Sequence, residues 1–511
     1  MDDVTEKITI KVALVSGRCE SISISKQCRV SVLTAAAKDA LQIYSLTLSK
    51  AGNILNPEDS LVDLDVSDGD ILMAIAEVPL LAATDFAFLC WSSSNGAVAW
   101  GNPNEGGDVS KVAGKLKDVE KVQASNGAFA AILKDGSVVT WGNPVAGGDS
   151  REVQHELKNV KEIQSDGTAF AALRADGRVL TWGSDRLGGN SQEVQGQLTE
   201  VHHIQAAEGA FAAIRKDGSV VSWGNPLASD CSDDVQEQLR DVQQIQATRG
   251  AFAAQLADGR VVTWGNKDLG AVSRRVQIRL QNVVQIKSTG GAFAAILSDR
   301  SVITWGNPKN GGDSSLVQPL QNVKQIQASQ NAFAAILFDG KVVTWGCPYS
   351  GGDSSKVAAQ LENVKEIQAN KVAFAAILSN GEVVTWGLSN QGGCCAHVQT
   401  RLKGVKQIQA TRLAFAALLS DETVVTWGHP NFGGDSSRVH EKLQNVQQIH
   451  ATSAAFAAQL GNGTIVAWGD PNAGGEKDPA CLLQLVPSAM GILGRRLSHI
   501  ISKARADLTE L

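Results

Sequence analysis

The chain has 511 residues, of which 43% are hydrophobic and 19% are charged, and its formal net charge is −6. These values are ordinary for a globular protein and exclude a disordered one. The 46 basic and 52 acidic residues are spread along the sequence, so we expect no nucleic-acid partner. The eight cysteines show no disulfide-like spacing, and the N-terminus lacks a signal-peptide core, so we expect a cytoplasmic or nuclear protein that is not secreted.

Residues 1–77 predict a small α+β domain. The stretch "ITIKVALVSGRCESISIS" predicts a hairpin around Ser16-Gly17, "RVSVLTAAAKDALQ" predicts a helix, and Ile71–Ala76 predicts a closing strand. This order, with "LNPEDSLVDLDVSDGD" before the last strand, resembles the ubiquitin-like (β-grasp) family. The family's carboxyl-terminal Gly-Gly is missing, because Glu77-Val78 continues into the next segment, so we do not expect conjugation.

The resemblance also bears on binding. Alignment with the family puts Thr47 and Ala74 at two positions of its apolar recognition patch, which predicts a weakened patch. Binding to ubiquitin receptors and a purely structural or capping role therefore both stay open.

The segment Ile71–Trp91 is almost apolar enough to cross a membrane. Glu77, Pro79 and Asp85 interrupt it, and its two halves belong to different elements. We therefore expect no transmembrane segment.

Residues 78–475 predict ten repeats of one short unit. Successive Trp-Gly pairs are 41 residues apart eight times and 40 residues apart once, and a Phe precedes each Trp by twelve residues. Each unit predicts three strands: one like "VKQIQAS" (Val323–Ser329), the wholly apolar "AFAAIL", and, after an Asp-Gly turn, "SVVTWG". The repeated Trp is expected in the core, since burying it removes about 200 Å² from water. The core tryptophans are Trp141, Trp182, Trp223, Trp264, Trp305, Trp345, Trp386, Trp427 and Trp468.

The rest of each unit, "NPxxGGDSSxVxxxLxNV", begins with turn signals. Its Val and Leu fit either one helical turn or a fourth, outer strand. The 40-residue unit lacks one residue beside Pro319, which would break a packed helix, so irregular or edge structure is favoured.

The pattern "VKQIQASxxAFAAILxDGxVVTWGNPxxGG" resembles the repeat of the regulator of chromosome condensation family and the shorter unit of β-lactamase inhibitory protein II. The resemblance implies a mainly β fold, a β-propeller in which each repeat is one blade. Those families close with seven blades, whereas this chain has ten units. A closed ring and an open superhelix therefore both remain possible.

Residues 476–511 predict an amphipathic helix, because apolar residues from Met490 to Leu508 recur at intervals of three and four. A cap on the last repeat is favoured over a helix that binds a partner.

No residue pattern predicts catalysis or a cofactor. Cys394, Cys395 and His397 lack zinc-ligand spacing, and the single Asp of each Gly-Gly-Asp element supplies too few oxygens for calcium. The resemblance includes ligases that end in a HECT domain, but only 36 residues follow Gly475. We therefore expect neither an enzyme nor a bound metal.

The units differ most in the turn before "AFAA" and in the loop after Trp-Gly. A rigid scaffold with variable loops is typical of a binding surface, so we predict a non-catalytic protein–protein interaction scaffold. The alternatives are a guanine-nucleotide exchange factor for a small GTPase, which the resemblance implies, and a substrate-recognition factor of the ubiquitin system. The partner stays unidentified. The candidate binding residues are Arg249, Lys371, Arg412, Tyr349 and Phe432.

Overall fold

The computed structural model describes residues 6–14, 17–41, 43, 46–76, 79–92, 96–317 and 319–475. The chain forms two compact units, one containing Met1–Pro79 and the other Leu80–Cys90 and Ala99–Lys477. The predicted helix in residues 476–511 lies outside the described residues. In the described part, no helix has both the length and the apolar character needed to cross a membrane.

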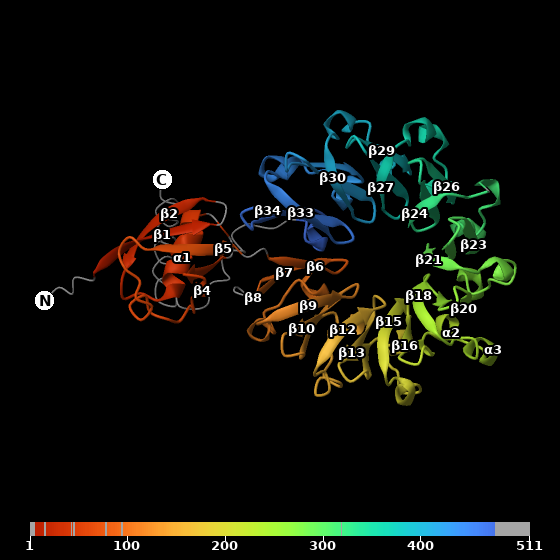
Figure 1. The fold of residues 1–511 in the computed structure, drawn as a ribbon, viewed down its shortest axis with the longest axis horizontal. Coiled ribbons are helices and arrows are strands. Elements are labelled where there is room, and N and C mark those ends of the chain that lie inside the picture. The colour runs from red at the N-terminus through yellow and green to blue at the C-terminus, as the bar shows by residue number, and fades with distance from the viewer. Residues whose placement is uncertain are drawn as a thin grey trace, which may run out of the picture. The chain divides into compact units, whose positions relative to one another are not determined.

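The first unit is a five-stranded sheet that packs against one helix (Figure 1). The strand order is β2-β1-β5-β3-β4, with β1 and β5 parallel. This is the predicted β-grasp topology. Alternate residues of β1 and one face of α1 form its apolar core. The elements are β1 Lys7–Leu14, β2 Cys19–Ser25, α1 Val30–Leu41, β3 Leu46–Lys50, β4 Asn53–Ile54 and β5 Ile71–Ala76.

The prediction of a weakened recognition patch is wrong for β5. Ala74 is fully buried in the core, whereas its neighbours Met73 and Ile75 are 36% and 44% exposed. Side chains of a strand alternate between faces, so Ala74 faces the core and does not contribute to a surface patch. The outer face of β5, which also carries Ile71, is apolar, and Thr47 of β3 pairs with Ile75 beside it.

Each of the ten repeats forms one three-stranded sheet, here called a blade, with the strands in chain order. The predicted strands are confirmed, since "AFAAIL" is β25 and "VKQIQA" is β24. The first strands, β6, β9, β12, β15, β18, β21, β24, β27, β30 and β33, span Leu80–Ala83, Val119–Ala124, Val160–Ser165, Val201–Ala207, Val242–Ala247, Val283–Ser288, Val323–Ala328, Val364–Ala369, Val405–Ala410 and Val446–Ala451.

The second strands, β7, β10, β13, β16, β19, β22, β25, β28, β31 and β34, span Ala87–Ser92, Ala128–Leu133, Ala169–Arg174, Ala210–Arg215, Ala251–Leu256, Ala292–Leu297, Ala332–Leu337, Ala373–Leu378, Ala414–Leu419 and Ala455–Leu460. The third strands, β8, β11, β14, β17, β20, β23, β26, β29, β32 and β35, span Gly96–Gly101, Val138–Gly142, Val179–Gly183, Val220–Gly224, Val261–Gly265, Val302–Gly306, Val342–Gly346, Val383–Gly387, Val424–Gly428 and Ile465–Gly469.

The segment after each Trp-Gly pair forms short helical turns. Within the described residues it contains no fourth strand, so the favoured irregular or edge structure is wrong. The alternative of one helical turn is correct, and such a turn forms at Ser315–Val317 even in the 40-residue unit. Blade 4 has the helices α2 Pro226–Ser229 and α3 Asp233–Gln236. The other blades have 3₁₀ turns at Pro103–Glu105, Ala113–Lys115, Pro144–Ala146, Asp185–Leu187, Gln195–Gln197, Lys267–Leu269, Gln277–Arg279, Pro308–Asn310, Ser315–Val317, Pro348–Ser350, Ser355–Gln360, Ser389–Gln391, Gln399–Arg401, Pro430–Phe432, Ser437–Lys442 and Pro471–Ala473.

The aromatic residues hold neighbouring blades together. In every blade the Phe and the Trp pair across two strands and stack, with ring centroids 5.1–5.4 Å apart. The nine predicted core tryptophans are 0–5% exposed. The indole N–H of Trp141 donates to the carbonyl of Gly106 in the preceding blade (3.1 Å), and the same bond recurs in most blades.

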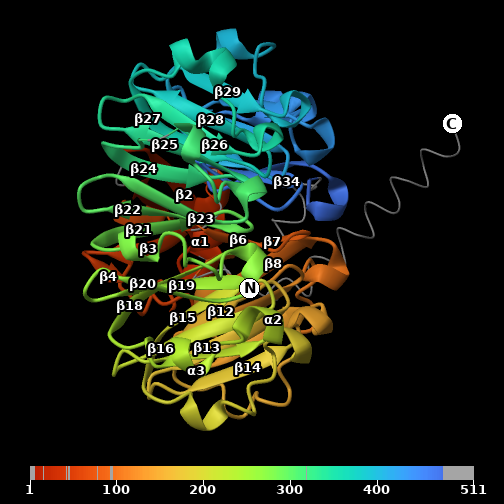
Figure 2. The ribbon, with the colours of Figure 1, turned by 90° about the vertical axis from the view of Figure 1, so that its right-hand side faces the viewer.

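The ten blades form a closed ring. The N–H of Trp100 in blade 1 donates to the carbonyl of Gly474 in blade 10 (3.2 Å), which is the bond that joins consecutive blades elsewhere. The first and last blades lie side by side in Figure 1, and Figure 2 shows consecutive blades one above another on one side of the propeller. The open superhelix, left possible by the sequence, is therefore excluded.

Candidate functional site

The turns between the first and second strands meet around the axis of the propeller. One residue of each turn donates its backbone N–H to the carbonyl of the equivalent residue in the next blade, with nine such bonds of 2.8–3.3 Å. At the remaining position, the N–H of Gly167 donates instead to Ser165 Oγ (3.1 Å). We call these ten residues the inner ring: Asp85, Asn126, Gly167, Glu208, Arg249, Gly290, Gln330, Lys371, Arg412 and Ser453.

The residue before each inner-ring position fixes the turn. In blade 2, Ser125 Oγ accepts from the N–H of Ala128 (2.9 Å) and donates to the carbonyl of Ala146 (2.8 Å). Ser or Thr makes this pair of bonds in most blades, and Asn370 makes it in blade 8. A short polar side chain that bonds its own backbone is typical of a tight turn. The inner-ring backbone is therefore closely similar in most blades, whereas its side chains vary.

The side chains of Asn126, Arg249 and Arg412 extend along the ring toward the following blade. A Cβ on Gly290 would lie 3.4 Å from Arg249 Nε, and a Cβ on Gly167 would lie 2.9–3.1 Å from atoms of the Asn126 amide. The two glycines thus leave space for the longer side chains that precede them. Arg412 reaches past blade 10 to Asp85 in blade 1.

Charge is divided between two parts of the inner ring. Blades 1–4 contribute Asp85 and Glu208, whereas blades 5–9 contribute Arg249, Lys371 and Arg412, which we call the basic arc. Two ion pairs lie where these parts meet: Arg412 Nη2 to Asp85 Oδ2 at 2.5 Å and Arg249 Nε to Glu208 Oε2 at 3.4 Å. Lys371, between them, makes no side-chain hydrogen bond or ion pair with another described residue.

The electrostatics follow from burial and these neighbours. Partial burial lowers the pKa of Lys371, and the nearby charges of Arg412 and Arg249 lower it further. Burial raises the pKa of Asp85, although Arg412 and Lys371 act against that rise. Because the charges of Arg412 and Arg249 both act on Lys371, the three basic side chains lie in one region of the inner ring.

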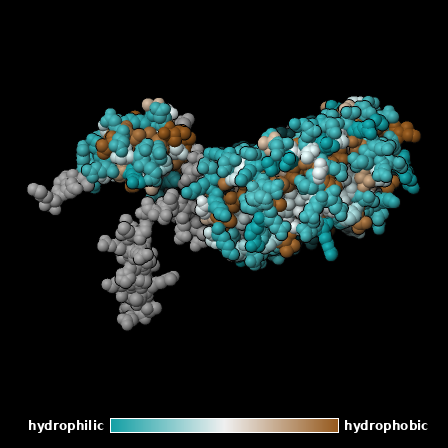
Figure 3. Space-filling view, turned by 90° about the horizontal axis from the view of Figure 1, so that it is seen from below, coloured by the Kyte–Doolittle hydropathy of each residue, from teal (hydrophilic) through white to brown (hydrophobic). Residues whose placement is uncertain are grey.

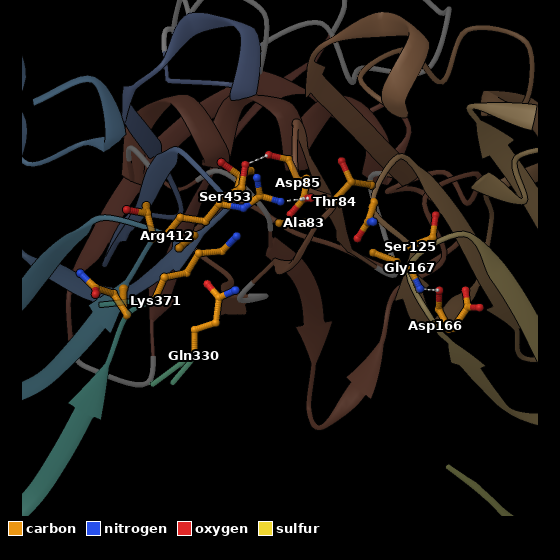
Figure 4. A pocket seen from close by; sticks show the side chains of 18 of the residues that line it. Ala83, Thr84, Asp85, Ser125, Asp166, Gly167, Gln330, Lys371, Arg412 and Ser453 are labelled. Carbon is orange, nitrogen blue, oxygen red and sulfur yellow. Dashed lines mark hydrogen bonds and ion pairs between the residues drawn. The ribbon is translucent and has the colours of Figure 1, made fainter. Parts of the chain in front are cut away.

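A cavity of about 760 Å³ lies at the inner ring. In Figure 4, Arg412, Lys371 and Gln330 lie on one side of it and Ser125, Asp166 and Gly167 on the other. This volume is within the range of ligand pockets. The side of the propeller visible in Figure 3 is mainly hydrophilic, with hydrophobic residues in small separate patches.

Three of the five candidate binding residues, Arg249, Lys371 and Arg412, occupy equivalent inner-ring positions. Tyr349 lies outside the ring on the turn Pro348–Ser350, where it is 77% exposed. Phe432 is partly buried and packs edge-on against His429, so it is not a free loop tip.

Sequence reasoning missed the acidic members, Asp85 and Glu208. The signal for them was available, because each follows the turn-forming position by one residue, as Lys371 follows Asn370. The unusual turns of blades 1 and 4 obscured it: blade 1 is degenerate in sequence, and blade 4 has Ala207 where most blades have Ser or Thr.

The described residues hold no group of three or more His, Cys, Asp or Glu that could bind a metal ion. Cys395 takes the place of a repeated serine, and its Sγ lies 3.0 Å from Gln399 Oε1, as Ser191 Oγ lies 2.8 Å from Gln195 Oε1. The aspartate of each Gly-Gly-Asp element accepts from the N–H two residues later, so it forms a turn. These aspartates are Asp108, Asp149, Asp313, Asp353 and Asp435.

No protein-family model matches the sequence, and no curated protein does. Among solved structures, the ectodomain of the Physcomitrella patens receptor kinase CR4 is 15% identical. The match covers 53% of this chain and 73% of the ectodomain chain, with a TM-score of 0.31. Prp20p of Saccharomyces cerevisiae, described with its binding to Gsp1p and histones, is 16% identical. The match covers 61% of this chain and 83% of Prp20p, with a TM-score of 0.31. The UBL domain of Plasmodium falciparum Dsk2 is 19% identical. The match covers 14% of this chain and 100% of the Dsk2 domain, with a TM-score of 0.14. The fold assignment rests on the sheet topology described above.

Proposed function

We propose that this chain is a non-catalytic protein–protein interaction scaffold whose recognition surface is the inner ring. One observation supports this most directly: ten equivalent positions, nine of which donate the same backbone hydrogen bond to the next blade, carry eight different residue types. A fixed frame with varied side chains can present a specific pattern of charge and hydrogen-bonding groups. The described cysteines are all free thiols, which supports a cytoplasmic or nuclear location.

The test is affinity capture of proteins from cells that make this chain, using the 511-residue protein as bait. The triple variant Arg249→Ala/Lys371→Ala/Arg412→Ala removes the basic arc. A matched variant, Lys309→Ala/Lys324→Ala/Lys365→Ala, removes three exposed lysines outside the ring. Proteins retained by the wild type and the matched variant, but lost with the basic arc, support the proposal. Identical protein sets for all three baits contradict it.

The same proteins separate the scaffold from an exchange factor. Fluorescent GDP release from a panel of small GTPases is measured with and without the chain. A scaffold leaves the release rate unchanged. Acceleration that the triple variant abolishes would replace the scaffold proposal with exchange activity.

A second candidate, a substrate-recognition factor of the ubiquitin system, is favoured by the outer face of β5. Exposed Ile71, Met73 and Ile75 form a short apolar row on this ubiquitin-like unit, and such rows often mark protein-binding sites. We expect Met73→Glu/Ile75→Glu to abolish capture of ubiquitin-binding proteins if this function is present. Equal capture by the variant and the wild type would remove the candidate.

A further inference from the structure

We propose that the basic arc binds carboxylate groups of an acidic peptide segment of the partner, with Lys371 as its central contact. This inference rests on the proposed function and names the chemistry of the segment that enters the inner ring.

The first argument is the unused capacity of Lys371. An ammonium group offers three hydrogen-bond donors, and Nζ of Lys371 makes no hydrogen bond or ion pair with another described residue. Arg412 and Arg249 are each engaged by one carboxylate, Asp85 and Glu208, and both side chains remain partly exposed, at 38% and 49%. A carboxylate near Lys371 would gain a charge-assisted hydrogen bond and relieve the mutual repulsion of the three cations.

The second argument is position. Lys371 belongs to blade 8, next to Arg412 in blade 9, and the backbone N–H of Lys371 donates to the carbonyl of Arg412 (3.2 Å). Arg249 of blade 5 extends toward Gly290 of blade 6 and also lines the cavity. The side chain of Gln330 lies on the same side of the cavity as Lys371 and Arg412 (Figure 4). The arc therefore combines cationic groups with a neutral amide, a set of groups suited to a peptide that carries carboxylates and backbone carbonyls.

The third argument is the limited positive charge. Three cations face two carboxylates, Asp85 and Glu208, within one ring, so a dense polyphosphate would meet repulsion from the acidic side. Carboxylates spaced along an extended segment can contact the basic arc and avoid Asp85 and Glu208. Charge complementarity thus favours an acidic peptide over a compact phosphate ligand.

The experiment measures fluorescence anisotropy of a labelled hexaglutamate peptide titrated with the 511-residue protein at about 50 mM salt, where the Debye length is longer than at physiological ionic strength. Hexaglutamine and tripolyphosphate are the comparison probes. We expect hexaglutamate to bind, hexaglutamine not to bind, and Lys371→Gln to weaken hexaglutamate about 5- to 10-fold. Lys371→Arg should retain binding, and Lys309→Gln, which removes a lysine outside the inner ring, should leave it unchanged.

A variant that strengthens binding gives a further check. Asp85→Asn keeps the backbone of the ring but removes the carboxylate that pairs with Arg412, so hexaglutamate should bind about 2- to 5-fold more tightly. A protein that merely lost its fold would not bind more tightly.

Three results would overturn the inference: no hexaglutamate binding, binding that Lys371→Gln leaves intact, or tripolyphosphate binding at the arc without hexaglutamate. Each of these is compatible with proteins that the wild type captures and the triple variant loses, because the donors of the basic arc also bind backbone carbonyls or other acceptors of a partner that presents no acidic segment. Failure of this inference and failure of the scaffold proposal are therefore distinguishable.

Discussion

At the scale of single residues, Asp166 stands out among the turn-forming residues of the inner ring because one of its carboxylate oxygens lacks a hydrogen-bond partner. Its Oδ1 accepts from the N–H groups of Thr168 and Ala169 (both 2.7 Å), as Ser and Thr do in other blades. Its Oδ2 is buried without a hydrogen-bond partner. The equivalent hydroxyl or amide elsewhere donates to a carbonyl 21 residues later, which in this blade belongs to Leu187. A carboxylate cannot donate, and only the protonated acid has a proton for that bond.

The stability of the protein should therefore depend on the protonation of Asp166. Burial raises the pKa of Asp166 to about 6 in the folded state, against 3.8 for an unperturbed Asp. Between these values the folded state binds more protons than the unfolded state, so this residue makes the free energy of unfolding fall as the pH rises from about 4 to about 6. Because the side chain is partly exposed, the change is about 1–2 kcal/mol, smaller than the full pKa difference implies.

Asp166→Asn tests this directly, since Asn370 already satisfies the equivalent turn with an amide, whose Nδ2 lies 2.7 Å from the carbonyl of Gln391. We expect Asp166→Asn to raise the free energy of unfolding by about 1–2 kcal/mol at pH 8 and by less at pH 5. Chemical denaturation of both proteins at the two pH values measures it. An equal effect at both pH values would show that protonation of Asp166 plays no part.

Trp264 offers a second test at the residue scale. Its indole N–H is buried without a partner. The residue equivalent to the accepting glycine is Ser229 in helix α2, and its carbonyl accepts from Ser222 Oγ (2.9 Å) instead. Trp305, the equivalent residue of the next blade, is similarly buried but donates to the carbonyl of Gly270 at 3.1 Å. We expect Trp305→Phe to lower the free energy of unfolding by about 1 kcal/mol more than Trp264→Phe does, since only Trp305 loses a hydrogen bond. If denaturant unfolding shows that both substitutions lower the free energy of unfolding equally, the hydrogen bond from Trp305 to Gly270 does not contribute to stability.

At the scale of elements, the Gly-Gly pairs couple the turn of one blade to the core of the next. Gly147 has φ = +91°, and a Cβ there would lie 2.4 Å from the ring of Phe170 in the following blade. The sequence indicated a turn at this position but not the contact across the blade interface. Turn formation is a local property, whereas the contact exists only once the two sheets have packed.

Replacement of this glycine should be costly. We expect Gly147→Ala to lower the free energy of unfolding by at least about 2 kcal/mol, through backbone strain and displacement of Phe170. Gly196 is the control, because a Cβ on it would meet nothing within 4 Å and its φ is not positive. Gly196→Ala should change stability by less than about 0.5 kcal/mol. Similar effects of the two substitutions in thermal unfolding would contradict the packing role.

The sequence predicts the strands well because each has a strong local pattern. "AFAAIL" is uniformly apolar and lies at the centre of its blade, and the Phe and Trp twelve residues apart become cross-strand partners such as Phe129 and Trp141. The candidate site was less accessible to prediction. Arg249, Lys371 and Arg412 are conspicuous as charged residues in a variable turn, but their convergence depends on ring closure. The side-chain pair Arg412–Asp85 joins residues 327 positions apart.

At the scale of the whole propeller, closure could not be predicted because a blade interface is the same in an open array and in a closed ring. Every blade is built from one continuous repeat, so blade 1 and blade 10 exchange no strand. Side-chain and turn contacts alone close the seam between them. Besides the bond from Trp100 to Gly474, the N–H and Oγ of Ser453 both donate to the carbonyl of Asp85, at 3.2 and 2.6 Å.

The interface between blades 1 and 10 has the same kinds of contact as the other blade interfaces, so it should open no more often than they do. We therefore expect amide hydrogen exchange of the backbone N–H of Ser453 to be as slow, within about tenfold, as that of Lys371 and Arg412, which make the same bond elsewhere in the inner ring. Ser453→Ala removes only the Oγ bond and should accelerate exchange at position 453 while leaving Lys371 unaffected. If Ser453 already exchanges a hundredfold faster than Arg412 in the wild type, the ring opens at the seam. The basic arc would then lose Asp85 as a neighbour in a substantial part of the population.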